Sequence, residues 1–148
     1  MVTTVGRKMP RVQSVVIPLL RDALPGGVDV GSWFSDVSRR QMPFLNVRRL
    51  GGLPEQSRPD LLDFAVIELT AYADARDDNY QGLTGCEDLY LDAKYVLFKA
   101  VRNQIVVNDI GYLHSYFETL GPTQLDSPFE DSWRVQGLIQ LGLRPVRN

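Results

Sequence analysis

The chain has 148 residues, with one Cys, one His, 16 Lys or Arg and 18 Asp or Glu, which give a net charge of −2. This length and composition are typical of one globular domain around one core. A single Cys excludes an internal disulfide and a zinc site built on several thiolates, and no stretch approaches the ~18 consecutive apolar residues of a membrane span. We therefore expect a single soluble domain over residues 1–148, in which residues 1–9 form a flexible N-terminal arm.

The N-terminal part of the chain predicts one helix and two strands. Apolar residues recur at helical spacing from Val12 to Leu24. Pro18 lies inside this segment and removes a backbone hydrogen bond, so we expect a kink in the helix. Residues 28–34 predict a short strand, and residues 44–50 predict a second strand that ends at Gly51.

A loop, a long helix and three more strands are expected in the rest of the chain. The loop covers residues 51–60 and leads into an alternating strand over residues 61–72. The helix is expected from about Thr84 to Asn103, because Thr84 and Glu87 have the T-x-x-E spacing of a capping box. An earlier start near Asn79 is the alternative, which Gly82 and Gly85 weaken. The last strands are expected over residues 112–120, ended by Gly121-Pro122, and over residues 133–143. This order predicts an α+β fold: a small mixed, mainly antiparallel sheet of about five strands, with two main helices packed on one face.

The residue types that most often carry catalysis do not form a recognisable motif. Cys86 lies at the start of the long helix and His114 lies in an expected strand, so a structural role is expected for each. The carboxylate pairs are sequence neighbours, which do not face each other on a helix or a strand: they are Asp77-Asp78, Glu87-Asp88 and Glu130-Asp131. The sequence also lacks the glycine motifs that bind phosphates. We therefore expect no enzyme activity, no cofactor and no metal site.

Charge is distributed unevenly along the chain. Residues 1–58 carry nine Lys or Arg and four Asp or Glu, a net charge of +5, whereas residues 59–148 carry seven and fourteen, a net charge of −7. One interpretation is ordinary solvated charge. The other is a head-to-tail contact, in which the basic part of one copy of the chain meets the acidic part of the next. The candidate interface residues are then Arg39, Arg40, Arg48 and Arg49 on the basic side, and Asp126, Glu130 and Asp131 on the acidic side.

A succession of sequence landmarks covers nearly the whole chain. They are the helical segment Val12–Leu20, the strand segment Pro43–Val47, the Gly51-Gly52 turn, the strand segment Asp63–Ala73 and the alternating segment Arg134–Arg144. In this order, they resemble the tail terminator proteins of long-tailed, siphovirus-type bacteriophages, particularly those of actinobacterial hosts.

The resemblance implies a structural virion protein of the tail–neck junction, made in the host cytoplasm and not associated with a membrane. Such a protein forms a ring, commonly a hexamer, that caps the tail tube, stops its polymerisation and provides the joint to the head connector. The implied partners are copies of itself, the major tail tube protein and the head-completion or connector protein, with DNA passing through the lumen without sequence-specific binding. Residues 51–60 and 121–131 are the expected axial contacts, because loops on a rigid sheet commonly carry recognition. The alternative is that they only connect neighbouring elements.

Two other classes of protein stay open from the sequence. Another phage neck protein, such as a head-completion stopper or a head–tail adaptor, shares the size and the ring architecture. A cellular small-molecule-binding domain would instead need a closed apolar pocket and would form a monomer or a dimer.

Overall fold

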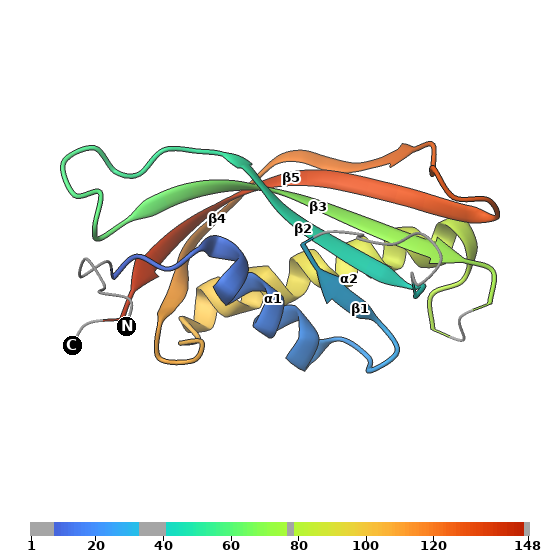
Figure 1. The fold of residues 1–148 in the computed structure, drawn as a ribbon, viewed down its shortest axis with the longest axis horizontal. Helices are drawn as coiled ribbons and strands as arrows, with labels where there is room; N and C mark the ends of the chain where they lie inside the picture. Colours follow the sequence, from blue (N-terminus) through green and yellow to red (C-terminus); the bar gives the residue numbers. More distant parts are fainter. Residues whose placement is uncertain (1–7, 33–40, 77–78, 147–148) are drawn as a thin grey trace, which may run out of the picture.

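The computed structural model describes residues 8–32, 41–76 and 79–146 and has a mixed α+β architecture (Figure 1). The sheet order is β1-β2-β3-β5-β4, with β1 parallel to β2 and the other three pairings antiparallel. The predicted fold class is therefore confirmed. In chain order the elements are α1 (Val12–Ala23), β1 (Asp29–Gly31), β2 (Phe44–Gly51), β3 (Asp63–Asp74), α2 (Gly82–Asn103), β4 (Gly111–Leu125) and β5 (Ser132–Pro145).

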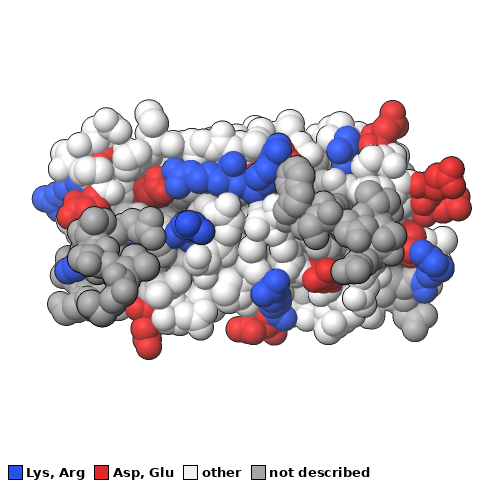
Figure 2. Space-filling view, viewed as in Figure 1, with Lys and Arg blue, Asp and Glu red and all other residues white. Residues whose placement is uncertain are grey.

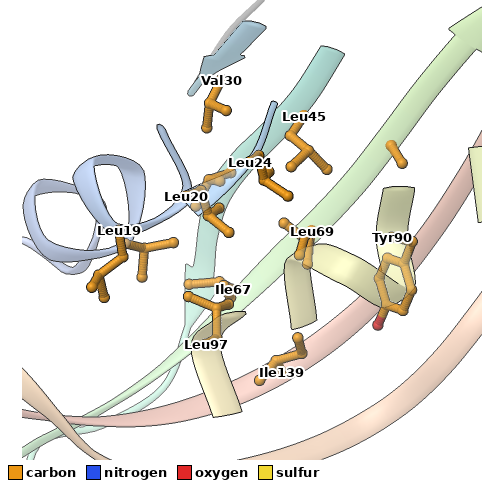
Figure 3. Packing of buried hydrophobic residues seen from close by; sticks show 14 of the residues in the cluster. Leu19, Leu20, Leu24, Val30, Leu45, Ile67, Leu69, Tyr90, Leu97 and Ile139 are labelled. Atoms are coloured by element: carbon orange, nitrogen blue, oxygen red, sulfur yellow. The ribbon is translucent and has the colours of Figure 1, made fainter. Parts of the chain in front are cut away.

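Both helices pack on the same face of the sheet (Figure 1). Successive side chains of a strand point to opposite faces, so Ile67 and Leu69 of β3 point to the helices while Glu68 points away. Ile67 and Leu69 are fully buried together with Leu20 of α1 and Leu97 of α2 (Figure 3). No helix covers the opposite face in the described part of the chain, and we call this face the open sheet face.

The first helix and strand agree with their sequence patterns. α1 begins at Val12 as predicted and continues through Pro18 to Ala23, and the kink at Pro18 stays a prediction. β1 covers Asp29–Gly31, which is the first half of the expected strand. Trp33 and Phe34 lie outside the described residues.

The predicted capping box at the start of the long helix is wrong. α2 begins at Gly82, and its N-cap residue Gln81 makes no side-chain capping hydrogen bond. Gly82 has a φ of 66°, a conformation that glycine adopts without strain, and this allows the chain to enter the helix before Thr84. Thr84 and Glu87 consequently lie inside the helix.

The fourth strand is longer than its sequence predicts. β4 continues through Gly121-Pro122 to Leu125, because the pairs Leu120↔Leu138 and Thr123↔Gln136 leave a bulge between them. β4 is the edge strand of the sheet, and an edge position tolerates the missing N–H of a proline. The expectation of a loop over residues 121–131 is therefore wrong for residues 121–125. The turn 126–131, which we call the acidic turn, is the actual connection between β4 and β5.

A loop lies between β2 and β3 as predicted, but it covers residues 52–62 rather than 51–60, and β3 runs over Asp63–Asp74 rather than residues 61–72. Backbone hydrogen bonds hold this loop in place: the Phe64 amide donates to the Leu53 carbonyl at 3.1 Å, and the Glu55 amide donates to the Leu62 carbonyl at 2.9 Å. The loop is thus ordered by β3 and presents its remaining side chains outward.

Residues 1–7 of the expected N-terminal arm lie outside the described residues, whereas Met9 packs against the core. Within the described ranges, no helix combines the length and the apolar character needed to cross a membrane.

Candidate interaction surfaces

Cys86 is a buried core residue. Its Sγ donates to the carbonyl oxygens of Ala71 at 3.2 Å and Trp133 at 3.4 Å. Burial raises the pKa of this thiol to about 11, so the reactive thiolate does not form near neutral pH. His114 is exposed in a β4 bulge, outside the helix-covered core that holds Cys86. The fold therefore keeps the two residues in separate environments.

The half-buried Glu118 is held by groups of the same chain. It accepts hydrogen bonds from the Tyr90 hydroxyl at 3.0 Å and from Lys94 Nζ at 3.2 Å. Burial raises the pKa of Tyr90, and the neighbouring Glu118 charge raises it further, so Tyr90 remains a hydrogen-bond donor. Across residues 8–32, 41–76 and 79–146, no group of three or more His, Cys, Asp or Glu is placed to hold a metal ion.

Two of the four arginines proposed as interface residues are paired within the subunit. Arg48 contacts Glu68 at 2.8 Å, directly across the β2–β3 register. Arg49 binds the two carboxylate oxygens of Asp63 at 2.6 and 3.0 Å, so it ties the end of β2 to the start of β3. The Arg48 side chain remains 46% exposed and is accessible to a neighbouring protein. Arg39 and Arg40 lie outside the described residues.

The acidic turn presents all three predicted acidic residues, Asp126, Glu130 and Asp131, to solvent. Its shape is held from within, because Ser132 Oγ donates to the Phe129 carbonyl at 2.8 Å and the Phe129 ring lies 5.8 Å from the Tyr72 ring. Figure 2 shows acidic residues gathered at the end of the molecule that carries this turn.

The open sheet face carries an exposed apolar surface. Leu53 of the 52–62 loop is 71% exposed, and Phe117 and Leu120 of β4 are 65% and 44% exposed. Next to Leu53, a cavity of about 370 Å³ is lined by Phe64 and Val66 and reaches Gln140, the register partner of Phe117. Exposed apolar surfaces of this kind mark interaction sites. We call it the sheet patch, and it consists of Leu53, Phe64, Val66, Phe117, Leu120 and Leu138.

A second apolar surface lies in the helical layer, between α2 and β4. There a cavity of about 300 Å³, which we call the helix groove, is lined by Tyr95, Phe98 and Tyr116, among others. The rings of Phe98 and Tyr116 meet edge to face at 5.8 Å, and Arg102 lies 5.8 Å from the Phe98 ring. Aromatic side chains with arginine at their rim are enriched in protein–protein interfaces.

The sequence contained a signal for the helix groove but not for the sheet patch. Leu91, Tyr95, Phe98 and Arg102 follow one another at spacings of four, three and four, which defines a second stripe on α2 beside its buried one. The sheet patch combines a loop residue with the open side of three strands, β3, β4 and β5, and only the β-sheet register brings those segments together.

A subunit with exposed apolar surfaces on both of its layers is typical of a component of a larger protein assembly. Residues 8–148 match the family described as phage tail termination protein, and the chain belongs to this family. It is a structural protein of a phage tail, and the predicted resemblance is confirmed.

The relatives agree with this family. The Gene 22 protein of Mycobacterium phage D29 is 45% identical over 141 residues, which cover 95% of this chain and 96% of the relative. The Gene 22 protein of Mycobacterium phage L5 is 47% identical over 141 residues, with the same coverage. Both phages have an actinobacterial host, as the resemblance implied.

A solved structure shares the fold. A chain in the virion of a native gene transfer agent particle superimposes with a TM-score of 0.53, over 90% of this chain and 94% of that chain. The two sequences are 12% identical, so the similarity concerns the fold alone.

Proposed function

We propose that the chain assembles into a closed ring at the tail–neck junction of a long-tailed phage, a hexamer as the resemblance implies. The ring caps the tail tube, stops its polymerisation and provides the joint to the head connector. The observation that carries this proposal is the pair of exposed apolar surfaces on opposite layers of one subunit, the sheet patch and the helix groove. A ring subunit needs two different surfaces for its neighbours and further surfaces for the structures above and below.

The sheet patch and the adjoining 52–62 loop form the proposed contact with the major tail tube protein. Leu53 belongs to both, and its exposed fraction of 71% is the largest among the large apolar side chains of the described residues. The loop is held by backbone bonds to β3, so docking on it requires little additional ordering. A tube protein that presents an apolar surface would bury this patch.

On this proposal the protein acts by contact, without catalysis, a cofactor or a metal. DNA passes through the lumen of the ring. The net charge of −2 suits this passage, because phosphate binding depends on clustered positive charge that releases counterions.

Deletion of the gene from its phage tests the proposal. Because the terminator ends tube growth, particles lacking it are expected to carry overlong tail tubes in electron micrographs, and wild-type protein supplied from a plasmid restores the normal length. Tails of normal length next to filled heads that leak DNA would contradict the proposal and would identify a head-completion stopper.

A further inference from the structure

A positively charged cavity of about 310 Å³ lies where β5 ends. Three cations line it: Lys8, Arg58 and Arg144, which come from three segments far apart in the sequence. The four ion pairs among the described residues involve other cations. Of these three, Arg58 lies close enough to Glu55 that its charge helps to lower the pKa of that carboxyl group. Asp60 also lines the cavity, so the described part of the lining carries three positive charges and one negative charge.

The apolar part of the lining gives the cavity a second recognition element. Leu61, 39% exposed, and Tyr112 lie in the same lining as the cations. A ligand that combines carboxylates with an apolar group would match this combination.

The acidic turn offers that combination at the other end of the subunit. It carries three exposed carboxylates around the exposed Pro128, and the half-buried Phe129 packs on Tyr72. The three carboxylates take no part in the four ion pairs of the described residues. A neighbouring cavity of about 570 Å³ is lined by Glu130 and Asp131 together with the ion pair of Asp74 and Arg76.

The two charged ends cannot meet within one subunit. β5 runs for 14 residues from the acidic turn to the basic cavity, and at about 3.3 Å per residue the strand is about 45 Å long. Figure 1 shows the acidic turn and the end of β5 at opposite ends of the long axis. If the acidic turn binds in this cavity, the turn must therefore belong to another molecule.

We infer that the acidic turn of one copy docks into the basic cavity of the next copy. This inference rests on the proposed ring and specifies its head-to-tail contact. The two surfaces differ, so the contact is heterologous, and repetition closes into a ring when the rotation between subunits permits closure. Complementary charges at such a contact fix the register of the two copies and speed their encounter.

The cavity favours a protein carboxylate over nucleic acid. Leu61 and Tyr112 lie in the lining beside the cations and match an acidic segment that also carries apolar side chains, whereas a duplex presents its phosphates without such a group. Asp60 repels either anion and does not distinguish them. Binding of DNA to the same cations is the competing outcome, and the experiment separates the two.

Charge reversal and charge exchange test the contact. Arg58→Glu and Glu130→Arg each place like charges at the junction, so each is expected to raise the concentration for half-maximal assembly by about tenfold or more in analytical ultracentrifugation. The double variant, with both substitutions in one chain, exchanges the charges and is expected to restore assembly to within about threefold of wild type. Asp22→Arg on α1 is the matched control. Asp22 is also an exposed acidic residue, and its replacement by Arg changes the charge by the same amount as Glu130→Arg. This variant is expected to leave assembly unchanged.

The outcomes separate this contact from the ring itself. Normal assembly by both single variants overturns the docking of the acidic turn and leaves the ring standing, whereas wild-type protein that forms no ring in solution or on purified tail tubes overturns the proposed ring. Losses that the exchange does not restore also overturn the contact. Tight binding of duplex DNA by the wild-type chain, lost in Arg58→Glu while assembly is normal, would assign the cavity to phosphates.

Discussion

Replacement of Phe117 tests the sheet patch as the contact with the tail tube. Phe117 is 65% exposed on the edge strand β4, so the folded subunit gains little from its ring. Phe117→Thr keeps a residue that suits a strand, and we expect the free energy of unfolding to change by less than about 0.5 kcal/mol.

The expected loss of binding follows from the exposed area. An aromatic side chain presents about 200 Å², of which the 65% exposed fraction leaves about 130 Å² for burial against a partner. At about 25 cal/mol per Å², burial of this area stabilises each subunit contact by up to about 3 kcal/mol. Its removal is expected to weaken binding by up to about a hundredfold.

Cosedimentation with purified tail tubes measures this loss as a change in Kd. Ile105→Thr is the control, because Ile105 is an apolar residue just after α2, 43% exposed, that belongs to neither the sheet patch nor the helix groove. We expect that variant to bind tubes as the wild type does. Unchanged tube binding by Phe117→Thr, or equal losses in the two variants, would refute the assignment of the sheet patch to the tube.

Two further predictions concern the subunit core. Gly137→Ala places a Cβ 1.8 Å from the hydroxyl oxygen of the buried Tyr90, so we expect the free energy of unfolding in urea to fall by about 1–3 kcal/mol. Gly26→Ala is the control, because its Cβ has no atom within 4 Å, and its stability should equal that of the wild type. Equal stabilities of the two variants would contradict this packing. The pKa of Cys86 is raised from 9.0 to about 11 in the folded state. The unfolded thiol therefore loses its proton first as the pH rises, and stability should fall between pH 9 and 11 by up to about 3 kcal/mol. Urea unfolding at several pH values measures this effect, and Cys86→Ala should remove the part of the pH dependence that Cys86 causes. The same decrease of stability with pH in Cys86→Ala would show that other groups cause it.

Local patterns predicted the elements, and the error at Gly121-Pro122 arose where a local signal met a nonlocal contact. The alternation over residues 133–143 and the helical spacing after Val12 specify the element type, because strand and helix periods depend on neighbouring residues alone. The pair Gly121-Pro122 is also a local signal, and by itself it predicts a turn. In the structure, Gly121-Pro122 forms a bulge in the edge strand β4, which stays paired with β5 on both sides of the bulge. That pairing joins segments separated in the sequence, so the local pattern does not predict it.

The candidate site depended on tertiary structure to a greater degree. The sequence alone establishes a charge asymmetry, a family resemblance and no catalytic motif, since these are properties of residue types and their order. The tertiary structure determines which charged side chains form ion pairs within the subunit. Arg48 and Arg49 lie beside Glu68 and Asp63 because β2 and β3 are antiparallel, whereas Lys8, Arg58 and Arg144 converge on one cavity from three segments. The partner of a charged side chain is set by strand register and by loop packing, and neither is contained in the local pattern of the chain.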